Sequence, residues 1–295
     1  MGARGAPDDP LNSGALTFLR TGHTMGKRIA FIGGGNMASA IIGGLLRQGF
    51  SAADIDVVEP WDEARARLAK DFGLSPHAEA GALLAGADMI VWAVKPQTFK
   101  DAAAAVRAHN QNALHLSVAA GITSQSIAQW LGSERIIRTM PNTPALIGKG
   151  ITALYGRPAV TEADKDWANE VIATTGATVW LTAEEQLDAV TAISGSGPAY
   201  MFYFMEAMTE AGAKLGLERD QAYQLAVATF IGAGELARAS TEPPETLRAK
   251  VTSKGGTTYA AITSMDESGV KDLFAKALFA AHKRAGELGA EFGKA

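Results

Sequence analysis

A glycine-rich segment near the N-terminus constrains the fold of this chain more than any other feature. Residues 27–33 (KRIAFIG) form a short apolar run that ends in glycine, which is typical of a buried parallel strand. The chain continues through Gly-Gly-Gly-Asn-Met-Ala at residues 33–38, a G-x-G-x-x-A pattern, into a helical stretch at residues 37–48. A glycine triplet also occurs in plain turns, but its position between a strand and a helix favours a dinucleotide-binding loop.

Each position of this pattern has a physical task in holding a dinucleotide. Gly33 permits the tight turn, Gly35 lets the backbone approach the pyrophosphate, and Ala38 lets the helix pack closely on the strand. Backbone N–H groups at the start of the helix then bind the negative phosphates, and Asn36 is suited to cap that helix. We therefore predict that the cofactor is bound by Gly33, Gly35, Asn36, Met37 and Ala38.

Apolar runs of strand length alternate with helical stretches over residues 27–181. This alternation predicts an α/β N-terminal domain of the Rossmann type, with a doubly wound, mostly parallel sheet. The expected strands cover residues 27–33, 55–59, 88–94, 114–118, 136–140, 151–155 and 178–181, and an amphipathic helix is expected at residues 62–72.

The pattern changes after Leu181. Thr182 and Glu185 have the Thr-x-x-Glu spacing of a capping box, and no convincing strand follows, so we expect an all-α domain over residues 182–295. The first of its helices is apolar on nearly every side, and a domain of this size leaves little room to bury it. We therefore expect a second subunit to cover it, in a homodimer. The expected helices cover residues 198–215, 219–239, 244–251, 258–265 and 270–288.

Composition excludes several classes of protein. The net charge is −4 and no Lys/Arg-rich run is present, so no nucleic-acid partner is expected. The chain has no cysteine, which excludes disulfides and thiolate metal sites and fits a reducing, cytoplasmic location. No apolar stretch has the length of a membrane span, so no membrane partner is expected. Residues 1–24 show no periodicity and no signal-peptide core, so we expect a disordered leader before a Rossmann domain at residues 25–181.

Glu59 ends the second expected strand. An acid at this position can accept a hydrogen bond from the adenosine ribose 2′-hydroxyl, and it repels a 2′-phosphate. The alternative is a solvated loop acid before Pro60. Arg65 and Arg67 follow closely and could neutralise a 2′-phosphate, so the choice between NADPH and NADH stays open.

Two further loops follow expected strands at their carboxyl ends, where sheets of this kind bind ligands. Lys95 precedes Pro96, which holds it extended. Its ammonium could reach a cofactor ribose or phosphate, and an exposed lysine without a role is the alternative. Asn142 lies in Met-Pro-Asn-Thr-Pro at residues 140–144, where two prolines fix a loop that presents its side chain, although turn chemistry alone could explain the pattern.

A second glycine-rich loop, Ser-Lys-Gly-Gly-Thr-Thr at residues 253–258, separates two expected helices. Gly255 and Gly256 can form a nest of convergent backbone N–H groups, which suits a carboxylate. The alternative is a joint in which Thr257 or Thr258 is the N-cap of the next helix, and both can hold together. No general acid stands out, and the five histidines form no metal-ligand cluster.

Several motifs in order resemble the pyrroline-5-carboxylate reductase family, over essentially all of residues 27–288. The resemblance implies a Rossmann domain joined to an all-helical dimerisation domain, with dimers that assemble into a decamer. The motifs are IGGGNMA at the first strand, AVKP at residues 93–96, MPNTP, SGSGPAY at residues 194–200 and a family signature between residues 244 and 266.

The resemblance also implies an activity and its site. NADPH or NADH supplies hydride, the C=N bond of the small imino acid 1-pyrroline-5-carboxylate is reduced, and L-proline forms in the last step of proline biosynthesis. Glu59 departs from the small hydroxyl-bearing residues of NADPH-preferring members, which weakens the inference of strict NADPH use. The implied substrate contacts are Ser253, Gly255, Gly256, Thr257 and Thr258, with the Thr258 hydroxyl as the catalytic group near the ring nitrogen, and further cofactor contacts are Ala93, Val94, Lys95, Pro96 and Asn142.

Two other classes of protein share parts of this pattern. A β-hydroxyacid dehydrogenase needs a catalytic lysine with an amide partner, but Lys214 stands near the end of its helix and residues 182–295 contain no asparagine. A redox sensor that binds a dinucleotide without turnover has no use for a carboxylate nest at residues 253–258. Oxidation of NAD(P)H with pyrroline-5-carboxylate separates both classes from a reductase.

Overall fold

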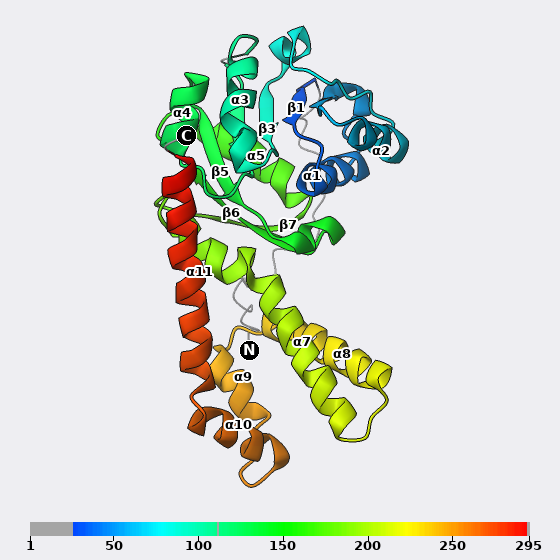
Figure 1. The fold of residues 1–295 in the computed structure, drawn as a ribbon, viewed down its shortest axis with the longest axis vertical. Helices are drawn as coiled ribbons and strands as arrows, with labels where there is room; N and C mark the ends of the chain where they lie inside the picture. The colour runs from blue at the N-terminus through cyan, green and yellow to red at the C-terminus, as the bar shows by residue number, and fades with distance from the viewer. Residues whose placement is uncertain (1–25, 111, 294–295) are drawn as a thin grey trace, which may run out of the picture. The chain divides into compact units, whose positions relative to one another are not determined.

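The computed structural model describes residues 26–110 and 112–293 (Figure 1). The leader expected at residues 1–24 lies outside the described residues. The described chain forms two compact units. One comprises residues 26–198 together with residues 277–293, and the other comprises residues 199–276. The last helix of the chain contributes residues to both.

The first unit is built on a seven-stranded sheet with the order β2-β1-β3-β4-β5-β6-β7. Neighbouring strands run parallel except β5 and β6, which pair antiparallel. The chain winds outward from β1 in both directions, so the predicted doubly wound, mostly parallel sheet is confirmed. The strands are β1 (Ile29–Ile32), β2 (Ile55–Val58), β3 (Met89–Trp92), β4 (Leu114–Ser117), β5 (Ile136–Met140), β6 (Gly150–Gly156) and β7 (Gly176–Trp180).

Apolar side chains alternate between the two faces of the sheet, because successive residues of a strand point to opposite sides. In β1, Ile29 and Phe31 pack in one core, which also contains apolar residues of α1, α2 and α5. Ala30 and Ile32 pack in a second core on the other face, with residues of α3 and α4. Both faces are covered, which explains why the inner strands read as continuous apolar runs. These helices are α1 (Asn36–Arg47), α2 (Asp62–Phe72), α3 (Pro96–Arg107), α4 (Ser124–Leu131) and α5 (Glu162–Ala173).

Two predicted helix caps are wrong. Gly35, rather than Asn36, is the N-cap of α1, and Asn36 is its first helical residue without a capping hydrogen bond from its side chain. Thr182 and Glu185 form no capping box. Instead the Gln186 side-chain oxygen accepts hydrogen bonds from the N–H groups of Thr182 and Ala183, both at 3.1 Å. Gln186, one residue later, thus accepts from the Thr182 N–H in place of Glu185. The helix that follows is α6 (Gln186–Val190), which passes into a π-helix at Thr191–Gly195.

Residues 182–198 and 277–293 belong to the sheet unit, although they are helical for the most part. The Glu184 carboxylate accepts a hydrogen bond from the Ser124 N–H at 2.6 Å and pairs with Arg138 at 2.6 Å. Near the C-terminus, Leu288 and Phe292 lie against Gly121. Packing therefore divides the chain after residue 198, whereas secondary structure changes after the last strand.

Residues 199–276 consist of helices, as expected from the sequence. Many of their large apolar side chains are exposed in the single chain, including Phe202 at 65% and Tyr203 at 69%. No helix in the described part of the chain has the length and hydropathy needed to cross a membrane. The helices are α7 (Gly197–Lys214), α8 (Arg219–Arg238), α9 (Pro244–Lys250), α10 (Thr257–Glu267) and α11 (Val270–Phe292), of which α7 begins and α11 ends in the sheet unit.

Candidate functional site

The glycine loop lies between the carboxyl ends of β1, β2 and β3. Gly33 has a φ of +95°, which favours glycine, and its N–H donates to the Val58 carbonyl at 2.8 Å. A Cβ on Gly33 would lie 2.5 Å from the Ala93 carbonyl oxygen, so no other residue fits without movement of the backbone. Ala38 is fully buried where α1 crosses the sheet. The tight turn and the close packing expected of Gly33 and Ala38 are therefore present.

The start of α1 leaves backbone donors open. A Cβ on Gly35 would meet no atom within 4 Å, so this glycine is not required by the protein's own packing. The N–H groups of Asn36, Met37 and Ala38 have no acceptor among the described residues. Unpaired N–H groups at a helix N-terminus form a favourable environment for an anion. The arrangement fits a phosphate group close to Gly35.

Glu59 holds this loop in place. It is 8% exposed, and its Oε2 atom accepts a hydrogen bond from the Gly34 N–H at 2.7 Å. Its Oε1 atom accepts from the Trp61 N–H at 3.0 Å. The interpretation of Glu59 as a solvated loop acid is thus wrong, because its carboxylate is buried and holds two backbone segments. A hydrogen bond to a ribose hydroxyl would use the remaining lone pairs of the same two oxygens.

The basic residues after Glu59 differ in their surroundings. The Arg65 guanidinium donates to the Glu59 carbonyl oxygen at 2.8 Å and pairs with Asp62. Arg67 is exposed on α2. Arg65 therefore has partners within its own loop, which reduces its availability to a 2′-phosphate.

The end of β3 contributes the next expected cofactor residues. The Ala93 N–H donates to the Ile32 carbonyl at 2.8 Å, which places the backbone of Ala93 and Val94 beside the glycine loop. Pro96 begins α3, and Lys95 is its N-cap with extended dihedral angles. The Lys95 side chain is exposed and forms no ion pair within the described part of the chain. The sheet thus brings together three of the predicted segments: the glycine loop, Glu59 and residues 93–96.

Asn142 has a structural connection that the sequence did not reveal. Its Nδ2 atom donates to the Ser194 carbonyl at 3.2 Å, and its Oδ1 atom accepts from the Ile151 N–H at 3.0 Å. Ser194 lies in the π-helix Thr191–Gly195, where the hydroxyls of Thr191 and Ser194 donate to carbonyls four residues earlier. π-Helical turns are frequent at functional sites. The sequence feature that marks this π-helical turn is the Ser-Gly-Ser-Gly run before Pro198.

The loop Ser253–Thr258 belongs to the unit of residues 199–276. Gly255 has a φ of +77°, and Gly256 is the N-cap of α10. No side chain caps this helix, so the alternative in which Thr257 or Thr258 is the N-cap is wrong. Among the described residues, the N–H groups of Thr257 and Thr258 have no acceptor, and both side chains are exposed. The loop therefore combines open backbone donors with free hydroxyl groups.

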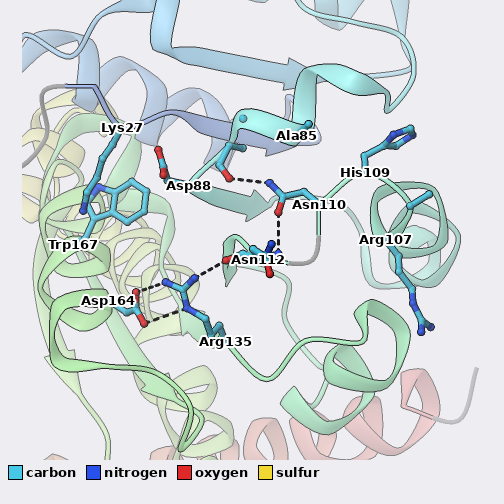
Figure 2. Close-up of a pocket in the computed structure, with 13 residues that line it drawn as sticks. Lys27, Ala85, Asp88, Arg107, His109, Asn110, Asn112, Arg135, Asp164 and Trp167 are labelled. Atoms are coloured by element: carbon cyan, nitrogen blue, oxygen red, sulfur yellow. Dashed lines mark hydrogen bonds and ion pairs between the residues drawn. The ribbon is translucent and has the colours of Figure 1, made fainter.

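A cavity of the sheet unit lies elsewhere, at the amino ends of the strands (Figure 2). It has a volume of about 590 Å³, and Lys27 and Asp88 line it where β1 and β3 begin. Arg135 pairs there with Asp164 at 2.6 Å, and the Lys27 ammonium lies 4.2 Å from the centre of the Trp167 ring. Ligands of such sheets bind at the carboxyl ends of the strands. This cavity lies at the opposite ends of the strands, and Arg135, Asp164 and Lys27 already have partners within the protein, so it is not the dinucleotide site.

Two partly or fully buried ionisable groups of the sheet unit have shifted pKa values. His115 is buried in β4, where its Nδ1 atom accepts a hydrogen bond from Trp92 Nε1 at 3.2 Å. Burial lowers the pKa of His115 to about 4, so the ring is neutral at physiological pH. Hydrogen bonds from Ser124 and Arg138 hold the pKa of Glu184 below its ordinary value, against the opposing effect of burial. The described residues contain no cluster of His, Cys, Asp and Glu suited to a metal ion.

Comparison with known proteins covers nearly the whole chain. A family model described as pyrroline-5-carboxylate reductase dimerisation matches residues 184–288, and one described as NADP oxidoreductase, coenzyme F420-dependent, matches residues 28–121. Pyrroline-5-carboxylate reductase of Pseudomonas aeruginosa is 45% identical over 269 residues, which are 90% of this chain and 98% of that protein. The protein of the same name from Haemophilus influenzae is 39% identical and covers 89% of this chain and 97% of its own length.

Solved structures agree with these relatives. A pyrroline-5-carboxylate reductase from Coxiella burnetii superposes with a TM-score of 0.83 at 36% identity, covering 89% of this chain and 98% of that one. A Plasmodium falciparum pyrroline carboxylate reductase with NADP bound gives a TM-score of 0.79 at 28% identity, covering 90% of this chain and 98% of the other.

Proposed function

This chain belongs to the pyrroline-5-carboxylate reductase family, and from that premise we propose that it reduces the C=N bond of 1-pyrroline-5-carboxylate to L-proline with hydride from NADPH or NADH. The observation that carries the proposal is the identity of 45% over 269 residues with a relative of that name, because it spans both units of the chain. The glycine loop described above supplies the physical basis. The reaction is the last step of proline biosynthesis.

The cofactor site is proposed at the carboxyl ends of β1, β2 and β3. The residues fit a dinucleotide, since Gly35 leaves open space and Asn36 and Met37 present unpaired N–H groups. Glu59 would accept from the ribose hydroxyls, and Lys95 would balance phosphate charge. The reduced nicotinamide, when bound, supplies the hydride. The proposed contacts are Gly33, Gly35, Asn36, Met37, Ala38, Glu59, Ala93, Val94, Lys95, Pro96 and Asn142.

The substrate carboxylate is proposed to bind the loop Ser253–Thr258. The Thr257 and Thr258 N–H groups at the start of α10 would donate to it, and the helix dipole adds positive potential at the same place. Gly255 and Gly256 let the backbone turn these donors toward the ligand. Ser253 stands at the other end of the loop, where its carbonyl oxygen accepts from the Gly256 N–H at 3.0 Å.

The chemical demands on the protein are modest. An imine protonated at its ring nitrogen accepts hydride at carbon. The C=N double bond becomes a C–N single bond, and its π electrons become the lone pair of a secondary amine. The chain therefore needs to orient the substrate and exclude water rather than supply a strong acid. The Thr258 hydroxyl oxygen would accept a hydrogen bond from the ring N–H. This contact would hold the ring nitrogen in place while the charge on that nitrogen changes.

Steady-state oxidation of NADH and NADPH with pyrroline-5-carboxylate tests the function. We expect turnover with proline as the product. Oxidation of the cofactor with β-hydroxyacids would favour the dehydrogenase class instead. Dinucleotide binding without any turnover would favour a redox sensor. Thr258→Ala is the matched variant, because a contaminating reductase in the preparation would be insensitive to it.

Domains, assembly and location follow as further parts of the proposal. We assign residues 25–181 to dinucleotide binding and residues 182–295 to dimerisation and substrate binding. A dimerisation domain is shared with the family, and the exposed aromatic side chains of α7 support a homodimer through the helical region. Assembly of dimers into a decamer and a cytoplasmic location are proposed from the family resemblance and from the absence of cysteine.

A further inference from the structure

Trp61 is exposed to an unusual degree for its type. Its exposed fraction is 68%, whereas Trp92 and Trp167 are buried and the remaining two of the five tryptophans are half-buried. Indole carries a large apolar surface, and tryptophan is highly buried on average. No aromatic ring or cation of the described residues stacks on the Trp61 side chain. Nothing in the packing of the sheet unit therefore accounts for a tryptophan at this position.

The backbone of Trp61 is fixed next to the glycine loop. Its N–H donates to Glu59 Oε1 at 3.0 Å, and the other oxygen of the same carboxylate accepts from the Gly34 N–H at 2.7 Å. The Trp61 carbonyl accepts from the Arg65 N–H at 3.0 Å in the first turn of α2. One buried carboxylate thus joins the backbone of Trp61 to the glycine loop, and the exposed indole lies on the segment next to the proposed pyrophosphate site.

A dinucleotide bound at this loop has a defined direction. Its pyrophosphate would bind at the start of α1, and its adenosine would extend past the end of β2, where Glu59 and Trp61 lie two residues apart. Aromatic side chains stack on nucleobases, and this contact tolerates any base because each has a π-face. The nearby Arg65 guanidinium is planar and could also stack on a base, but it donates to the Glu59 carbonyl and pairs with Asp62.

We propose that the Trp61 indole stacks on the adenine ring of the dinucleotide and is a cofactor-binding residue of this enzyme. The inference rests on the dinucleotide site of the proposed function. It adds a contact to the base, which neither the glycine loop nor Glu59 provides. Since the indole contacts only the adenine half, it should strengthen binding of NADH and NADPH alike.

Ligands that represent the two halves of the cofactor test this assignment on the full-length chain. ADP-ribose contains the adenosine and the pyrophosphate but no nicotinamide, whereas reduced nicotinamide mononucleotide contains no adenine. The variants are Trp61→Ala and Trp61→Phe, and Trp130→Phe is the matched control in a half-buried tryptophan of α4. Calorimetry gives the dissociation constants, and intrinsic fluorescence reports on the indole directly.

We expect Trp61→Ala to weaken ADP-ribose and NADH by a similar factor of about 5- to 150-fold, which is the range for loss of one base–aromatic stack. Binding of reduced nicotinamide mononucleotide and the melting temperature should be unchanged, and Trp61→Phe should retain most of the affinity. ADP-ribose should quench the fluorescence of the wild type more strongly than that of Trp61→Phe.

Two results would overturn the assignment. Unchanged ADP-ribose affinity in Trp61→Ala would exclude the stack, and if the sedimentation coefficient fell as well, Trp61 would belong to a subunit contact. Equal weakening of reduced nicotinamide mononucleotide would show that the substitution disturbs the whole loop. Because ADP-ribose binding involves no turnover, the outcome is independent of whether the chain reduces pyrroline-5-carboxylate.

Discussion

The Glu59 carboxylate accepts a hydrogen bond from the backbone N–H of Gly34, with 2.7 Å between Oε2 and the nitrogen. The residue that ends β2 therefore sets the conformation of the glycine loop before any cofactor arrives. Glu59 therefore has two effects, which a substitution must distinguish. One is the charge next to the ribose, and the other is the support of the loop.

Glu59→Gln should change the choice of cofactor. The substitution removes the negative charge that repels a 2′-phosphate but keeps one oxygen as an acceptor for a backbone N–H. We expect kcat/KM for NADPH relative to NADH to rise by about 5- to 30-fold, which corresponds to about 1–2 kcal/mol of like-charge repulsion. Glu59→Ser should shift the ratio in the same direction and also weaken both cofactors, because serine is too short to reach both N–H groups.

Glu63→Gln on the exposed side of α2 is the control, and it should leave the ratio unchanged. A wild-type enzyme that does not use NADH at all would contradict this role of Glu59.

Gly35→Val should abolish tight cofactor binding without unfolding the chain. The added side chain enters space that is open in the protein, and Gly35 has an ordinary φ of −71°, so the melting temperature should hold. The side chain would displace the pyrophosphate from the N–H groups of α1. We expect affinity for NADH to fall by at least about tenfold, measured by calorimetry, from the loss of a charge-assisted hydrogen bond.

Gly81→Ala is a suitable control, since a Cβ there also meets no atom within 4 Å. Unchanged binding in Gly35→Val would remove the pyrophosphate from this loop.

Thr258→Ala should lower turnover more than it weakens cofactor binding. Its hydroxyl is exposed and does not cap α10, so the melting temperature should stay the same. Loss of one hydrogen bond to the ring nitrogen corresponds to about 1–3 kcal/mol, or roughly 5- to 150-fold in kcat. Gly256→Val should instead raise the KM for the substrate, because it crowds the carboxylate-binding backbone.

Thr257→Ala, one residue earlier, should retain most of the turnover. Normal kinetics in a destabilised Thr258→Ala protein would mean that this residue has a structural role only.

His115 should make the protein less stable in acid. Burial lowers the pKa of its ring to about 4, compared with 6.5 in an unfolded chain, so the unfolded state binds the proton first. This contribution to stability is complete above pH 6.5 and is lost as the pH falls from 6.5 toward 4. The loss amounts to about 3 kcal/mol across that window.

His115→Gln keeps an acceptor for Trp92 Nε1 but cannot titrate. The free energy of unfolding, measured by urea denaturation at several pH values, should therefore fall less steeply in the variant between pH 6.5 and 4. Parallel curves for variant and wild type would show that the buried ring does not control acid stability.

Phe202→Glu should disrupt the assembly. The side chain is 65% exposed in the single chain, on a helix whose first turns are apolar, and a buried carboxylate at a subunit contact is strongly unfavourable. We expect sedimentation velocity to show a smaller species, with loss of activity if the dimer is needed for folding of the helical region. Lys70→Gln, on an exposed position of α2, also lowers the net charge by one unit and controls for that change. A wild-type chain that sediments as a stable, active monomer would contradict the proposed dimer.

The strands of the sheet could be predicted closely from the sequence, because each apolar run is bounded by glycine, proline or a polar segment. The expected run at residues 55–59 and β2 (Ile55–Val58) differ by a single residue at one end. The helix caps could not be predicted as well. At the start of α6, several polar side chains compete for the same N–H groups, and Gln186 rather than Glu185 accepts from them.

In the candidate site, too, some features could be predicted from the sequence and others could not. Gly33, Ala38 and the loop at residues 253–258 could be found because local backbone geometry demands particular residue types. The contacts of Glu59 with Gly34 and of Asn142 with Ser194 join residues far apart in the chain, and no local pattern encodes them. Trp61 was missed for a related reason, since the sequence gives no measure of its exposure.

The carboxyl and amino ends of the strands offer different opportunities for labelling. The carboxyl ends of β1, β2 and β3 carry the glycine loop, whereas the amino ends border the cavity of Figure 2. His109 is exposed at the cavity by the amino ends, and the chain contains no cysteine. His109→Cys would therefore introduce the sole thiol of the protein. A dye attached there could report on assembly or on movement of the units while the cofactor loop keeps its native surface.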